Sequence, residues 1–146
     1  MNNTIFNWFE EAVPNPTAKN FNIQLGVHLE EFYEMLDTIK CEDRAWETLK
    51  AAVFSVAYNL KAGHTQAGCI DLEGLLDAMC DQVVTATGVA YMAGSDFDSA
   101  LAEVNRSNWS KFENGKAVFD ENGKIKKGAN YSRPAIGKYV QAFPRE

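Results

Sequence analysis

Five acidic side chains are grouped at spacings that suit metal chemistry. Glu30, Glu31 and Glu34 fall within one short stretch, and Asp77 and Asp81 stand four residues apart in another. Side chains three or four residues apart lie on the same face of a helix. Carboxylate oxygens are the ligands that Mg²⁺ and Mn²⁺ prefer, and helical bundles build metal sites from inward-facing carboxylates. The spacing therefore predicts a carboxylate cage if the two acidic faces meet.

A solvated acidic surface is the ordinary alternative for the three glutamates. They lie in a helix predicted over residues 17–40, nearly opposite its main apolar stripe, where charged side chains usually face water. Ile23 and Val27 project on the acidic side, however, and no lysine or arginine within four residues offsets the repulsion between the glutamates. These details favour a covered face. The stripe consists of Phe21, Leu25, Leu29, Phe32, Leu36 and Ile39.

A second helix, predicted over residues 72–93, repeats the arrangement. Asp77 and Asp81 lie opposite an apolar stripe, and further apolar side chains share the acidic side. Apolar side chains beside the acids predict that another helix or a second copy of the chain covers this face. The stripe contains Leu72, Leu75, Leu76, Met79 and Val83, and the acidic side contains Val84, Tyr91 and Met92.

The remaining pattern is also helical up to residue 112. Helices are predicted over residues 4–13, 43–61 and 97–110, and the helix over 43–61 is apolar over much of its surface, so it should be largely buried. A small hairpin is expected over 118–125, around Asn122-Gly123. The predicted fold is all-α, a bundle of four to five helices over residues 1–112. A basic C-terminal extension, residues 113–146, is expected to pack on the same domain.

Composition narrows the class of protein. The 146 residues carry a net charge of −6, with 16 acids and 5 bases through residue 105 and 9 bases and 4 acids after it. Overall acidity disfavours nucleic-acid binding, although the basic end can meet a phosphate-bearing small molecule or the acidic body itself. The three cysteines form no paired motif, and no apolar run is long enough for a membrane span. A cytoplasmic protein is expected.

Three segments resemble one family. Glu30–Glu34 is an EExxE motif, Asp77–Asp81 stands where a second acidic motif is expected, and Glu103–Lys111 reads EVNRSNWSK. Together they resemble the all-α pyrophosphohydrolase superfamily that includes MazG, dimeric dUTPases and phosphoribosyl-ATP pyrophosphohydrolase, and especially its phage and bacterial members. The resemblance spans roughly residues 15–135. The usual second motif is ExxD, but Ala78 stands three residues before Asp81.

The resemblance implies a reaction and a metal site. The reaction is hydrolysis of a nucleoside triphosphate to a monophosphate and pyrophosphate, with Mg²⁺ or Mn²⁺ neutralising the phosphate oxygens. Glu31, Glu34 and Asp81 are the implied metal ligands. Asp77 replaces the missing glutamate, either directly or through a water. Glu30 is the implied general base, or a ligand of a second metal.

The resemblance also implies the residues that bind the substrate. Arg106 and Lys111 are candidates for the β- and γ-phosphates, with Asn108 beside them, and Asn20 and Gln24 are candidates for the base or sugar. A structural salt bridge is the alternative for Arg106, and a solvated side chain is the alternative for Lys111.

Other functions stay open at this point. The substrate can be phosphoribosyl-ATP instead, or the chain can be a non-catalytic nucleotide-binding helical oligomer. In each case the two-faced helices favour a homodimer or homotetramer with no nucleic-acid or membrane partner.

Overall fold

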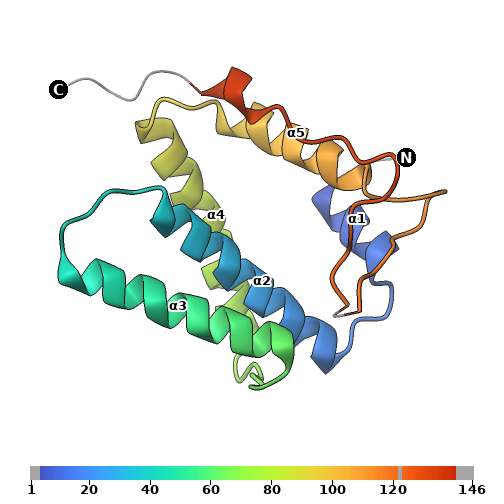
Figure 1. Cartoon of the computed structure of the whole chain (residues 1–146), viewed down its shortest axis with the longest axis horizontal. Helices are drawn as coiled ribbons and strands as arrows, with labels where there is room; N and C mark the ends of the chain where they lie inside the picture. The colour runs from blue at the N-terminus through green and yellow to red at the C-terminus, as the bar shows by residue number, and fades with distance from the viewer. Residues whose placement is uncertain (1–3, 122, 141–146) are drawn as a thin grey trace. The chain divides into compact units, whose positions relative to one another are not determined.

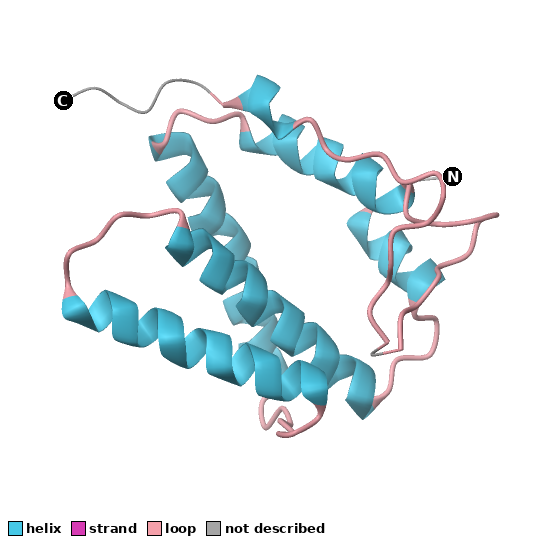
Figure 2. Cartoon of the chain, in the orientation of Figure 1, coloured by secondary structure: helices cyan, strands magenta, loops and turns pink. Residues whose placement is uncertain are grey.

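The structure, a computed structural model, describes residues 4–121 and 123–140. Over these residues the chain is all-α, as predicted, with helices joined by loops and no strand (Figure 2). No described helix has the length and apolarity needed to cross a membrane. The helices are α1 (Ile5–Ala12), α2 (Ala18–Asp37), α3 (Arg44–Ala62), α4 (Leu72–Met92), α5 (Phe97–Trp109) and the short 3-10 helix η1 (Ile136–Tyr139).

Local signals explain where the helices begin and end. The side chains of Thr17 and Asp71 accept hydrogen bonds from backbone N–H groups in the first turns of α2 and α4, as their N-cap positions predict. At α2 the cap is reciprocal, because the Asn20 side chain in turn accepts a bond from the Thr17 backbone N–H. Gly63 ends α3 in the left-handed conformation, with φ 74°, which glycine adopts without strain. All five helices were predicted to within one turn.

The chain divides into two compact units. The α2–α3 unit contains Asn15–Gly68 and the hairpin tip Phe119–Lys124. The α4–α5 unit contains Met1–Pro14, Cys69–Val118 and Ile125–Glu146, and therefore α1, α4, α5 and η1. The boundary predicted at residue 112 is not the division between these units.

In the α2–α3 unit, α2 and α3 run antiparallel and side by side (Figure 1). On α2 the buried residues are Asn22, Gly26 and Leu36, so only one member of the predicted apolar stripe is buried. The packed face is displaced round the helix toward Glu30, because small Gly26 lets α3 approach most closely there. The Asn22 side-chain amide also donates to the Ala67 carbonyl and accepts from the Ala67 backbone N–H, which attaches α2 to the loop after α3.

Replacing Gly26 by alanine is expected to destabilise the protein by about 1–2 kcal/mol, since overpacking costs more than the gain in helix propensity. A Cβ at this position would lie 2.7 Å from Lys61 Cγ and 2.9 Å from the Ala57 carbonyl oxygen. The carbonyl cannot rotate away, so the helices must separate. Gly88 in α4 is the matched control, because an added Cβ meets nothing within 4 Å there. Urea denaturation should show Gly26→Ala losing stability and Gly88→Ala retaining or gaining it; equal effects would contradict the close packing.

Apolar burial in α3 and α4 differs from the prediction. In α3 only Ala57 and Leu60 are buried, so the expectation of a largely buried helix is wrong for the single chain. In α4 no residue is buried. The predicted stripe of α4 is open, with Leu72 at 76% and Leu76 at 67% exposure. Periodicity marked the apolar faces correctly, but it does not specify what covers them.

The core of the α4–α5 unit is aromatic. Trp8, Ala12 and Phe112 are buried together, and Trp109 and Ile125 pack against them. The ring of Trp8 stacks on that of Phe112 with centroids 5.7 Å apart. The Trp8 Nε1–H also donates to the Asn108 carbonyl at 3.0 Å. Helix α1 is thereby tied to the end of α5.

Hydrogen bonds attach the C-terminal extension to α5. Glu103 accepts from the Arg106 guanidinium at 2.7 and 2.9 Å and from the Ala135 backbone N–H at 2.9 Å. The Ser132 backbone N–H donates to Ser110 Oγ at 2.8 Å. The extension is therefore ordered along this helix as far as the described residues reach; residues 141–146 lie outside them.

The predicted hairpin has backbone hydrogen bonds between its two arms. The Asp120 N–H donates to the Lys124 carbonyl, and the Lys126 N–H donates to the Val118 carbonyl, each at 2.9 Å. Gly123 has φ 78°, as a tight turn requires. Asn122, the first residue of the expected turn, lies outside the described residues.

The Glu103 ion pair predicts a pH effect on stability. Hydrogen bonds from Arg106, and next from the Ala135 backbone, lower the pKa of Glu103 from its ordinary 4.5 to about 2. A depressed folded-state pKa stabilises the fold above the unfolded value, and this contribution is lost as pH falls from 4.5 toward 2. Glu103→Gln should therefore be less stable than the natural chain at pH 7, and the difference should shrink across this window. Chemical denaturation at several pH values measures it, and a pH-independent difference would contradict the ion pair.

Candidate functional site

Glu30 is the best-defined acid of the predicted cluster. Its side chain is 28% exposed at the edge of the α2–α3 contact. Lys61, in the last turn of α3, places its Nζ 2.5 Å from Oε1, and Lys124 of the hairpin tip places its Nζ 3.3 Å from Oε2. The repulsion among the glutamates is thus offset by lysines far away in the sequence. The basic end of the chain meets the acidic body through Lys124, one of the two possibilities open from the charge distribution.

The two lysines also set the protonation of Glu30. Partial burial by itself raises the pKa of Glu30, but the hydrogen bond from Lys61 and the charges of both ammonium groups outweigh it and hold the pKa below its ordinary value. Glu30 is therefore a carboxylate at neutral pH. It is a weaker proton acceptor than an isolated glutamate.

Glu31 and Glu34 lie on the exposed side of the same helix. They are three residues apart, so their carboxylates project from one face. Asp77 and Asp81 are likewise exposed and share a face of α4, in the other unit. Both pairs are thus open to solvent, in contrast to Glu30.

The donor chemistry of these pairs fits Mg²⁺. Proteins commonly hold this ion through one or two carboxylates together with substrate phosphates and waters. Within the two described stretches of chain, no group of three or more Asp, Glu, His or Cys side chains stands close enough to hold a metal ion. Each unit therefore presents a carboxylate pair, and the four-residue cage remains a prediction.

The residues predicted to bind substrate have separate local roles. Asn20 caps α2, and Gln24 lies exposed on the same helix. Arg106 forms the ion pair with Glu103, the alternative that the sequence left open, and its side chain remains 47% exposed. Asn108 accepts the Trp8 bond through its carbonyl. Lys111 lies beyond the end of α5, with its Nζ 6.0 Å from the centroid of the Trp8 ring.

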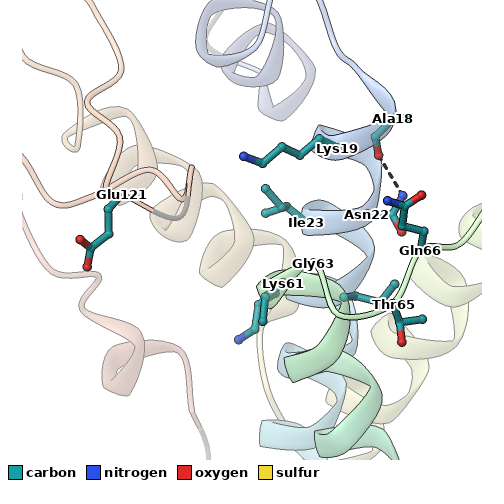
Figure 3. Close-up of a pocket in the computed structure, with 11 residues that line it drawn as sticks. Ala18, Lys19, Asn22, Ile23, Lys61, Gly63, Thr65, Gln66 and Glu121 are labelled. Atoms are coloured by element: carbon teal, nitrogen blue, oxygen red, sulfur yellow. Dashed lines mark hydrogen bonds between the residues drawn. The ribbon is translucent and has the colours of Figure 1, made fainter.

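A cavity of about 340 Å³ opens in the α2–α3 unit, close to Glu30. Its polar side chains come from three segments, and Lys61 both lines it and bonds Glu30. Figure 3 shows the Lys19 and Lys61 side chains extending to the same side of their helices. Its lining includes Lys19, Ile23, Leu60, Lys61, Gln66 and Glu121.

Sequence reasoning did not single out Lys19 or Lys61, and it included Lys124 only within the basic C-terminal extension. One signal was present: Gly26 interrupts a helix one turn before Glu30, and a glycine inside a helix often marks a close approach of another element. Nothing in the sequence specified which residue approaches.

Comparisons of the chain with family models, curated proteins and solved structures found no match. The resemblance carried by the three motifs therefore stays a prediction.

Proposed function

We propose that the chain is a Mg²⁺-dependent nucleoside triphosphate pyrophosphohydrolase of the MazG type, converting a (d)NTP and water into a (d)NMP and pyrophosphate. The observation that carries the proposal is the pair of exposed carboxylates on each of two helices, Glu31 with Glu34 and Asp77 with Asp81. Exposed, closely spaced carboxylates are the kind of group through which proteins bind a hydrated cation.

Each side chain of the proposed site has its own role. Glu31, Glu34 and Asp81 would hold Mg²⁺, with Asp77 as a fourth ligand, direct or through a water. Mg²⁺, when bound, neutralises the phosphate oxygens that would otherwise repel the attacking water. Glu30, kept ionised by its lysines, orients that water by accepting a hydrogen bond.

Arg106 and Lys111 remain the proposed contacts for the outer phosphates. Arg106 keeps part of its guanidinium open beyond the Glu103 pair. Helix α5 ends at Trp109, which places Lys111 in the turn that follows the helix.

A cytoplasmic homodimer or homotetramer is part of the same proposal. Helix α4 exposes apolar side chains along its length, including Val84 at 67%, Tyr91 at 74% and Met92 at 70%, beside Asp77 and Asp81. Covering this face in a second copy would bury apolar surface and enclose the carboxylates. The molar mass in solution tests it, and a stable monomer would contradict it.

A non-catalytic nucleotide-binding oligomer is the second candidate. The observation that favours it is the double ion pair of Glu30, which neutralises one acid of the predicted site. Replacement of the usual glutamate by Asp77 points the same way.

Pyrophosphate release separates the two. The purified chain is incubated with NTPs, dNTPs and phosphoribosyl-ATP, in Mg²⁺ and in EDTA, while thermal stability is followed with and without the ion. Metal-dependent release of pyrophosphate from a nucleoside triphosphate supports the proposal. Thermal stabilisation by Mg²⁺ with no turnover of any substrate would favour the second candidate.

A further inference from the structure

The cavity between the ends of α2 and α3 combines charged, polar and apolar side chains. Lys19 and Lys61 supply two ammonium groups, Ile23 and Leu60 supply apolar contact, and Gln66 supplies an amide. Glu121 adds a carboxylate from the hairpin tip. The volume of about 340 Å³ lies at the lower end of the range for small-molecule sites.

Lys19 has no evident structural purpose. It is the second residue of α2, and a cation in the first turn of a helix opposes the helix dipole. Its side chain is exposed, and no ion pair forms at it among the residues the structure describes. Helix stability therefore does not explain a lysine at this position.

Lys61 is shared between the cavity and Glu30. Its aliphatic stem crosses Gly26, where an added Cβ would lie 2.7 Å from Lys61 Cγ. Its ammonium group reaches Glu30, and the residue also lines the cavity. An ammonium group has three donors, so Lys61 can donate to a bound anion and to Glu30 together.

We propose that this cavity binds a small phosphorylated ligand, with the phosphate held by Lys19 and Lys61. The chemistry of the remaining wall describes the rest of the molecule. Ile23 and Leu60 contact an apolar surface such as a ring, and Glu121 accepts a hydrogen bond from a hydroxyl or amino group. A nucleoside monophosphate has all three features. Binding here requires no turnover and no metal.

The test is calorimetric titration of the full chain with deoxyadenosine 5′-monophosphate and with deoxyadenosine, both in EDTA. EDTA removes binding through a metal at the carboxylate pairs. The monophosphate is expected to bind, and deoxyadenosine is expected to bind at least about 10-fold more weakly, because charge-assisted bonds to the phosphate are missing. Equal affinity for the two compounds, or no binding of the monophosphate, would overturn the proposal.

Variants locate the binding. Lys19→Gln is expected to weaken binding of the monophosphate by about 5- to 10-fold, because it removes one of the two ammonium groups that contact the phosphate. Lys40→Gln is the matched control: Lys40 is an exposed lysine paired only with Glu42, at 3.6 Å, among the described residues, and affinity should not change. Circular dichroism confirms that both variants fold. Equal affinities for the two variants would place the phosphate elsewhere and overturn the assignment.

Inhibition kinetics show whether the cavity belongs to the substrate site or is a separate effector site. If the chain hydrolyses triphosphates, competitive inhibition by the monophosphate places the cavity within the substrate site, and non-competitive inhibition makes it a separate effector site. Either pattern, lost in Lys19→Gln and retained in Lys40→Gln, supports the cavity as the binding site. A pattern unchanged by Lys19→Gln would count against it.

Discussion

Replacing Glu34 by glutamine is expected to lower kcat for pyrophosphate release by at least about 100-fold, the loss typical when electrostatic stabilisation of a transition state is removed. Glutamine keeps the size of the side chain and removes only its charge. Glu34 is exposed on α2, so the fold should survive the change. The measurement is pyrophosphate release at saturating triphosphate and Mg²⁺, with the thermal midpoint of the variant determined in parallel.

Two further variants make this result specific. Asp81→Asn should cause a loss of similar size, because Asp81 is the proposed ligand from the other acidic helix. Glu73→Gln is the matched control, since Glu73 is an exposed acid in the first turn of α4 with no proposed role. Full activity in Glu34→Gln or Asp81→Asn would show that the proposed site is wrong even if the reaction is right.

The helices could be predicted because their signals are local. Pro14 and Pro16 end one helical pattern, and Thr17 and Asp71 provide side-chain caps within three residues of the backbone groups they satisfy. Apolar residues at steps of three and four supply the rest. None of these signals depends on residues far away in the chain.

The packed face of α2 could not be predicted in the same way. A helical projection takes the most apolar stripe as the core, but two of the three buried residues of α2 are Gly26 and Asn22, one small and one polar. Backbone proximity, rather than apolar content, selects that face. Glu30 therefore lies at the contact edge while Glu31 and Glu34 remain open, a distinction that the EExxE spacing does not contain.

The environment of Glu30 could not be predicted from the sequence for a related reason. Its partners stand 31 and 94 residues away in the sequence, at Lys61 and Lys124. Local charge counting found no basic partner near the three glutamates, whereas folding brings two distant lysines to Glu30. The lowered pKa of Glu30, caused by these lysines despite the opposing effect of burial, makes the three acids chemically different from one another. The sequence predicted where the acids cluster; the tertiary contacts determine how the environment of Glu30 differs from that of its neighbours.

Trp8→Ala is expected to cost about 3–5 kcal/mol of stability, the usual range when a large aromatic side chain is removed from a core. Trp8 is only 8% exposed, stacks on Phe112 and makes an edge contact with Phe9 at 4.9 Å. Among the described residues of the α4–α5 unit, only Ala12, Ser107 and Phe112 are buried besides Trp8, so the loss falls on a small core. Urea denaturation followed by helical circular dichroism measures it.

Trp8→Phe separates packing from hydrogen bonding at the same position. Phenylalanine keeps the stack on Phe112 but removes the Nε1–H that donates to the Asn108 carbonyl. That carbonyl still accepts from the Lys111 backbone N–H at 3.1 Å, so it keeps a partner and the loss should be about 1–2 kcal/mol. If packing dominates, stability should be lowest in Trp8→Ala, intermediate in Trp8→Phe and highest in the natural chain. Equal losses in the two variants would instead assign the attachment of α1 to the hydrogen bond, and a loss below about 1 kcal/mol in Trp8→Ala would contradict the buried position of the Trp8 side chain.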